Sequence, residues 1–239
     1  MNNSLVIFDI DGTLTDTNAV DDECYCRAVA DVLGLNSSEI DWADAPHVTD
    51  SGIADWLWKR HRDRPPTMDE VSHLRRRFMA LLEDQAATAP ERFAAIKGAN
   101  EVVDRLVAAA WTVALATGGW YMSAAMKLRL IGLSPGTVAM ASADDSHSRE
   151  EIVQLAQRRA ETRASGQFQP VVSVGDAPWD VRTACKLGMP FVGVGSGPKA
   201  ERLRVAGAAV VVADLTYEPL LQALTQARVP VPDATDLQG

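Results

Sequence analysis

The chain has 239 residues, 47% hydrophobic and 23% charged, a mixture that excludes a disordered or fibrous protein. Lys and Arg together number 23 and Asp and Glu 32, so the net charge is −9, which disfavours nucleic acid and anionic membranes as partners. Three cysteines are too few for a disulfide framework and no apolar run reaches the roughly 20 residues of a membrane span, so we expect a reduced, cytoplasmic protein and leave its oligomeric state open.

Short apolar runs rich in β-branched residues recur along the chain, and most of them end in polar or glycine-rich turns. These runs predict strands at residues 5–8, 112–116, 137–140, 171–174, 191–194 and 209–212. Apolar residues at helical spacing lie between most of them. This alternation predicts an α/β fold with a three-layer, Rossmann-like parallel sheet core that is covered by helices on both faces.

One long segment after the first strand breaks this alternation. Val20, Cys24 and Ala28 fall on one helix face, and two further stretches carry apolar residues at helical spacing up to Leu82. The segment contains no convincing strand pattern. We therefore predict an all-helical insert over residues 17–93, and a core formed by residues 1–16 and 94–239.

Acidic and hydroxyl side chains follow three of the predicted strands. Asp9 and Asp11 follow the first strand, Thr117 follows the second, and Asp176 and Asp180 follow the run at 171–174. Ligands of open α/β sheets bind beyond the carboxyl ends of the strands. Carboxylates that meet there repel one another without a cation, and oxygen ligands of this kind suit Mg²⁺.

These segments resemble the signatures of a known superfamily. Asp9-Ile10-Asp11-Gly12-Thr13 resembles the first signature of the haloacid dehalogenase-like hydrolases, Ala114-Leu115-Ala116-Thr117 the second, and Gly175-Asp176-Ala177-Pro178-Trp179-Asp180 the fourth. The helical insert directly after the first signature is similar to the family's cap of the first type. The resemblance implies a Rossmann-like core with a helical cap and a phosphatase of the phosphoglycolate-phosphatase-like kind.

The third signature departs from the family pattern, which usually has a Lys at the start of a helix. Arg149 stands in that place and can neutralise phosphate as Lys does. Lys127 competes for the role, but it falls inside the helix that follows Thr117, and we expect it to point elsewhere.

The resemblance implies a two-step phosphoryl transfer to and from an aspartate. Asp9 is expected to attack phosphorus, and Asp11 to protonate the leaving oxygen and then to take a proton from water. A halide leaving group needs no such acid, so Asp11 favours a phosphatase or phosphomutase over a dehalogenase.

The remaining roles also follow from the resemblance. Thr117, Gly118 and Arg149 are expected to bind the phosphoryl group of a small phosphorylated substrate. Mg²⁺ is expected to be held by Asp9, the main-chain carbonyl of Asp11, Asp176 and, in support, Asp180. Thr49 and Ser51, in a polar loop of the insert, are candidates for substrate contact.

Simpler interpretations stay open for several of these residues. Asp180 and Thr117 are also suited to helix capping, and Arg149 to a solvated first turn. A basic cluster in the insert, from Lys59 to Arg77, either draws anionic substrate inward or is a solvated face. The alternatives to a phosphatase are a phosphomutase of the same superfamily and a catalytically inactive member that acts as a binding protein.

Overall fold

A computed structural model of the chain describes residues 4–36, 40 and 45–231. Its core is a six-stranded, all-parallel sheet in the order β5-β4-β1-β6-β7-β8. The strands are Ser4–Phe8 (β1), Trp111–Ala116 (β4), Ala139–Ala141 (β5), Val171–Gly175 (β6), Phe191–Val194 (β7) and Val211–Val212 (β8). The predicted α/β class and parallel sheet are confirmed.

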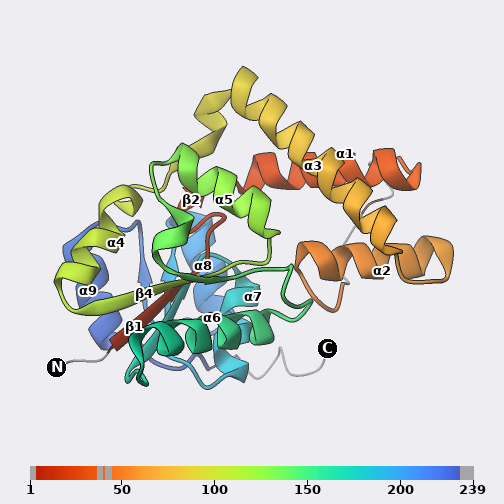
Figure 1. The fold of residues 1–239 in the computed structure, drawn as a ribbon. Helices are drawn as coiled ribbons and strands as arrows, with labels where there is room; N and C mark the ends of the chain where they lie inside the picture. Colours follow the sequence, from red (N-terminus) through yellow and green to blue (C-terminus); the bar gives the residue numbers. More distant parts are fainter. Residues whose placement is uncertain (1–3, 37–39, 41–44, 232–239) are drawn as a thin grey trace.

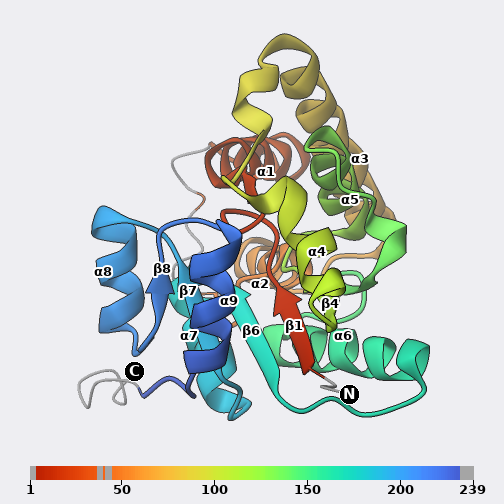
Figure 2. The same ribbon diagram turned by 90° about the vertical axis from the view of Figure 1, so that its left-hand side faces the viewer.

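Helices cover both faces of the sheet, as Figures 1 and 2 show. They are Ala99–Ala108 (α4), Tyr121–Leu130 (α5), Arg149–Ala164 (α6), Pro178–Lys186 (α7), Gly197–Val205 (α8) and Tyr217–Gln226 (α9). Val6 and Phe8 of β1 share a core with α4, α5 and α9, whereas Leu5 and Ile7 share one with α6, α7 and α8. Alternate residues of a strand point to opposite faces, so β1 is buried on both sides and reads as a continuous apolar run.

The strand order explains why chemistry gathers beyond β1. The chain runs outward from β1 through β4 to β5, then returns to the other side of β1 at β6 and runs outward again to β8. β1 is therefore flanked by β4 and β6, and the direction of winding reverses there. Ligand crevices of open parallel sheets lie at such a reversal.

Three helices lie beyond the carboxyl ends of the strands rather than on the faces of the sheet (Figure 2). They are Asn18–Leu33 (α1), Asp50–Arg62 (α2) and Met68–Thr88 (α3), and together we call them the helical unit. Val20, Cys24, Phe78 and other apolar side chains give the unit its own core, which also takes in Trp120 from the sheet domain. A Thr67–Glu70 capping box begins α3.

Two short strands stand where the chain crosses between sheet and helical unit. Thr15–Asp16 (β2) pairs antiparallel with Ala94–Ala95 (β3). They lie at the boundaries of the predicted insert at residues 17–93, and the division into core and cap stays a prediction. No sequence pattern marks these two-residue strands.

Predicted and observed strands differ mainly at two places. β5 and β8 each begin later than the predicted runs at 137–140 and 209–212, and residues Pro135–Thr137 form a 3-10 turn before β5. Among the described residues, no helix has the length and apolar character needed to cross a membrane.

Candidate active site

Asp9 and Asp11 lie in the turn that follows β1, and both side chains are held by threonines. The Thr13 hydroxyl donates to Oδ2 of Asp9 at 3.2 Å, and the Thr17 hydroxyl donates to Oδ1 of Asp11 at 2.6 Å. Gly12, between the two, has φ +78°, a conformation that L side chains rarely adopt. The turn therefore places two carboxylates beyond the end of β1, with Asp9 buried.

Three carboxylates from two adjacent strand ends form a compact buried group. One oxygen from each of Asp9, Asp176 and Asp180 lies within 4.8 Å of the others. Asp176 also accepts hydrogen bonds from Asn18 at 3.0 Å and from Thr13 at 3.4 Å, and it pairs with Lys199 at 2.8 Å.

The donor set of this group fits a hard divalent cation. Its atoms are carboxylate oxygens, the ligand type that Mg²⁺ and Ca²⁺ prefer. Burial is costly for charges of like sign unless a cation accompanies them. The Asp11 carboxylate lies outside the group, so a contribution from Asp11 would come from its main chain, which is the role that the resemblance implies.

Arg149, the first residue of α6, reaches over the same carboxylates. Its Nη1 lies 2.7 Å from Oδ1 of Asp180 and 3.7 Å from Oδ1 of Asp9, and its Nε donates to the carbonyl of Val48 at 2.9 Å. The side chain is mostly buried and is not a solvated first turn. A Cβ atom at Gly118 would lie 2.7 Å from Nη2 of Arg149, so glycine leaves the space that the guanidinium uses.

Burial dominates the electrostatics of the group. Burial, and next the nearby Asp180 carboxylate, raise the pKa of Asp9 well above its usual range, and Arg149 opposes them. Burial raises the pKa of Asp180 to about 6, against the lowering effect of Arg149. The Asp180 carboxylate also accepts from the backbone N–H groups of Asp176 and Ala177, so it caps α7 as well as facing the site.

Thr117 and Gly118 follow β4, directly beside the β1 turn. Thr117 is buried, and its Oγ1 accepts a hydrogen bond from the Gly119 N–H at 3.0 Å. Its hydroxyl proton makes no hydrogen bond to another described residue. The Gly118 carbonyl accepts from the N–H of Asp50 at 2.8 Å, which joins this loop to the start of α2.

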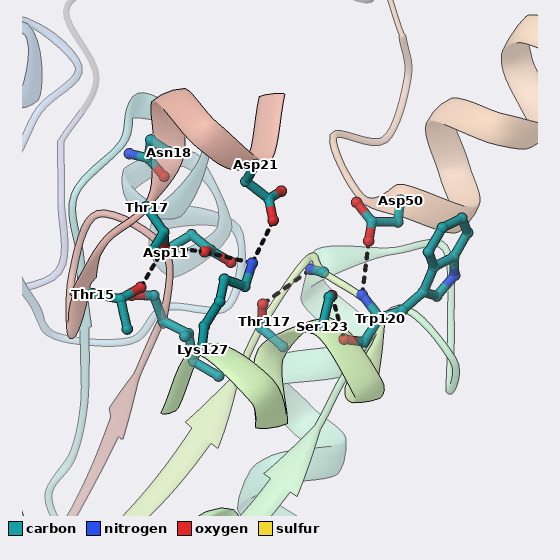
Figure 3. Close-up of polar contacts among 12 residues, drawn as sticks. Asp11, Thr15, Thr17, Asn18, Asp21, Asp50, Thr117, Trp120, Ser123 and Lys127 are labelled. Atoms are coloured by element: carbon teal, nitrogen blue, oxygen red, sulfur yellow. Dashed lines mark hydrogen bonds and ion pairs between the residues drawn. The ribbon is translucent and has the colours of Figure 1, made fainter. Parts of the chain in front are cut away.

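Lys127 connects the second aspartate of the turn to the helical unit. Its side chain is fully buried, and its Nζ lies 2.6 Å from Oδ1 of Asp11 and 2.5 Å from Oδ1 of Asp21 in α1 (Figure 3). Burial alone would lower the pKa of Lys127, but the two carboxylates outweigh it and raise the pKa above its usual value. The expectation that Lys127 points away from the site is wrong.

A cavity of about 100 Å³ lies between these loops and the helical unit. The sheet side contributes Asp9, Asp11, Thr117, Gly118, Gly119, Arg149 and Trp179. Helix α1 contributes Asn18, Asp21, Asp22 and Tyr25, and the start of α2 contributes Val48, Thr49, Asp50 and Ile53. The predicted residues Asp9, Asp11, Thr117, Gly118 and Arg149 therefore meet at one cavity, whereas Asp176 and Asp180 do not line it.

The two predicted substrate contacts differ in position. Thr49 lines the cavity, but its hydroxyl caps α2 and donates to the carbonyl of His147 at 2.8 Å. Ser51 donates to the carbonyl of Ala143 at 2.7 Å and accepts from the indole N–H of Trp120 at 2.7 Å, which holds α2 to the core. Neither hydroxyl has a free proton for a ligand.

Sequence reasoning set aside one cation of the site, Lys127, and missed another, Lys199. Lys127 shares its helix face with the buried Ser123 and Ala124, and a Lys among small buried residues is a signal that the sequence did contain. Lys199 follows β7 and donates to the carbonyl of Gly12 at 2.9 Å, besides its contact with Asp176. Applying the strand-end rule to the loop after β7 points to Lys199.

Comparison with known proteins decides the family. The family model described as haloacid dehalogenase-like hydrolase matches residues 4–188. The chain belongs to the haloacid dehalogenase-like hydrolase family. The resemblance drawn from the signatures is confirmed.

Three known proteins align along most of the chain. A phosphoglycolate phosphatase of Mesorhizobium japonicum is 23% identical over 206 residues, which cover 82% of this chain and 85% of that protein. A hydrolase from Pseudomonas syringae superimposes with a TM-score of 0.69 and 21% identity over 92% of this chain and 97% of its own. A β-phosphoglucomutase from Clostridium difficile superimposes with a TM-score of 0.66 and 16% identity over 95% of this chain and 98% of its own. The two structures share the fold of this haloacid dehalogenase-like hydrolase.

Proposed function

We propose that this protein is a Mg²⁺-dependent phosphatase that hydrolyses a small phosphomonoester through a phosphoaspartyl intermediate. The observation that carries the proposal is the convergence of Asp9, Asp11, Thr117 and Arg149 on one cavity beside a buried carboxylate group. Family membership and the phosphoglycolate phosphatase relative support the same reaction. The helical unit would act as the cap that excludes bulk water from it.

In the first step a carboxylate oxygen of Asp9 forms a bond to phosphorus while the bond from phosphorus to the alcohol oxygen breaks. Asp11 gives a proton to the departing alcohol. In the second step the oxygen of a water molecule forms a bond to phosphorus while the bond from phosphorus to the Asp9 oxygen breaks. Asp11 takes a proton from that water, and inorganic phosphate leaves with the Asp9 carboxylate restored. The Thr117 hydroxyl, the Gly118 backbone and Arg149 would bind the phosphoryl oxygens.

A Mg²⁺ ion would be held by Asp9, the main-chain carbonyl of Asp11, Asp176 and Asp180, and it would offset the repulsion between carboxylate and phosphate. The Thr13, Asn18 and Lys199 side chains hold Asp176 toward this group.

The charge of the cavity wall favours a phosphatase over a phosphomutase. Among the described lining residues, Arg149 is the only Lys or Arg, and it belongs to the reacting phosphate. Segments 37–39 and 41–44 of the insert contain neither Lys nor Arg. A mutase must also bind a second phosphate group, for which this wall offers no cation.

The wall also restricts the leaving alcohol. The part contributed by α1 includes Asp22, whose carboxylate makes no hydrogen bond or ion pair to another described residue. We therefore propose a neutral or cationic alcohol, such as a small polyol, rather than one that carries a carboxylate. The basic residues of the insert, from Lys59 to Arg77, do not line the described cavity, so they do not offset this charge.

The test is phosphate release from p-nitrophenyl phosphate and from small phosphomonoesters by the purified chain with Mg²⁺. We expect turnover by the wild type and none by Asp9→Asn, which removes the nucleophile and conserves its shape. Phosphate release by Asp9→Asn at the wild-type rate would refute the nucleophile assignment, and an inactive wild type would refute the phosphatase.

A further inference from the structure

The two oxygens of the Asp11 carboxylate have different surroundings. Oδ1 receives the Lys127 ammonium at 2.6 Å and the Thr17 hydroxyl at 2.6 Å. Oδ2 receives neither. A Cβ atom at Gly119 would lie 3.7 Å from Oδ2, so this oxygen faces the Thr117–Gly119 loop on the cavity wall. The network holds one oxygen and leaves the other for chemistry.

The position of Lys127 is itself fixed. Its side chain is fully buried, it rises from α5 of the core, and its second partner is Asp21 in α1 of the helical unit (Figure 3). A buried ammonium is unfavourable unless it is paired, and Asp11 and Asp21 both pair with this one. Because Nζ lies between the two carboxylates, its place beside Asp11 is set in part by the docking of α1.

Proton transfer to a leaving group requires a placed acid. The donor must lie within hydrogen-bond reach of the leaving oxygen, and a displacement of about 1 Å costs on the order of 100-fold in rate. Thr17 alone gives Asp11 a single hydrogen bond to Oδ1, about which the carboxyl can still turn. Lys127 supplies the second contact that fixes it.

We infer that Lys127 is a positioning residue for the proton transfer assigned to Asp11: it fixes the carboxyl through Oδ1, turns Oδ2 toward the cavity, and through Asp21 makes this placement depend on helix α1. The inference rests on the proposed phosphatase reaction. Lys127 acts through Asp11, and the acid is assembled when α1 is packed against the core.

Leaving-group selectivity tests the inference, because only some leaving groups need the acid. The p-nitrophenolate ion departs without a proton, whereas the alkoxide of glycerol 1-phosphate needs one. For Lys127→Met in the full chain, we expect the ratio of kcat/KM on the alkyl phosphate to kcat/KM on the aryl phosphate to fall by about 10-fold or more. Lys127→Arg should restore part of the ratio.

Leu128→Ala provides the matched control. Leu128 is the next residue of α5 and is fully buried in the sheet core, so its truncation destabilises the same helix without touching Asp11. We expect its selectivity ratio to stay at the wild-type value. A ratio for Lys127→Met that stays within twofold of this control would overturn the inference.

A second variant covers the case in which Lys127→Met does not fold. The double variant Lys127→Met/Asp21→Asn removes one cation and one acid together, so the net charge is unchanged and only Asp11, of the two acids, has lost its cation. It should show the same fall in the ratio, and a wild-type ratio would again overturn the inference. A wild type inactive on both substrates would instead refute the proposed phosphatase and remove the basis of the inference.

Discussion

Gly12 lies so close to Asp176 that a Cβ atom at position 12 would overlap the Oδ2 atom of Asp176. The missing side chain lets the turn after β1 pass directly beside the carboxylate group. The geometry of the proposed metal site thus depends on a residue that contributes no ligand.

Gly12→Ala should therefore impair metal binding and catalysis. We expect the positive φ and the overlap to cost about 1–3 kcal/mol of stability, and displacement of Asp176 to lower kcat/KM by roughly 100-fold. Gly34→Ala is the control, because Gly34 has φ +70° with nothing within 4 Å of an added Cβ. Wild-type activity in Gly12→Ala would contradict this account of the turn.

Removal of divalent metal should abolish activity, since three carboxylates and a phosphate then meet without sufficient positive charge. EDTA should inactivate the wild type and Mg²⁺ should restore it. Mg²⁺ at about 100 times its Kd should also stabilise the fold by about 2.7 kcal/mol, seen as a rise in Tm. Asp176→Asn should lose most of this rise. If Mg²⁺ does not change the Tm of the wild type, the proposed metal site is wrong.

Arg149→Ala should lower kcat/KM by about 100-fold or more, because it removes a charge at the developing phosphoryl anion and leaves Asp180 without its cation. Arg149→Lys keeps the positive charge but not the paired N–H donors of the guanidinium, so we expect a rate between those of the wild type and Arg149→Ala. Arg159→Ala serves as a control on the same helix, since Arg159 pairs with Asp145 away from the described cavity. Equal rates for Arg149→Ala and Arg159→Ala would show that Arg149 is structural.

The charge of the cavity wall should appear in substrate preference. At about 4 Å, repulsion between two carboxylates amounts to roughly 1–4 kcal/mol at a protein surface, so 2-phosphoglycolate should be hydrolysed about 10-fold less efficiently than 2-hydroxyethyl phosphate. Asp22→Asn should narrow the gap between the two substrates. If 2-phosphoglycolate is the better substrate of the wild type, the proposed preference for a neutral or cationic alcohol is wrong.

Local sequence patterns predicted the sheet and the acids at its edge, because both depend on short-range features. A buried run such as Leu5–Phe8 identifies its strand, and the residues that follow it must lie at the carboxyl edge of the sheet. Asp9 and Asp176 meet for this reason alone. Lys127, which contacts Asp11, was set aside and Lys199, which contacts Asp176, was missed, because their roles depend on contacts across elements.

The helical unit was predicted as a segment but not in its contacts. The spacing of Val20, Cys24 and Ala28 gives the inner face of α1, which is buried as expected. The pairing of Asp21 with Lys127 depends on how that helix docks, and no spacing within α1 encodes it. The Thr49 and Ser51 hydroxyls donate to carbonyls of the core, and these contacts likewise depend on how α2 docks. They leave neither hydroxyl proton for a ligand in the cavity.

The pairing of β2 with β3 means that the chain leaves the sheet domain and returns to it at one spot. A module whose two ends are already adjacent can be exchanged for another of different length without disturbing its host, since no strand of the sheet has to shift register. Grafting the segment of a relative that corresponds to residues 17–93 between these strands offers a way to transplant selectivity for the alcohol, with Thr17, Asn18 and Asp21 kept because they contact Asp11, Asp176 and Lys127.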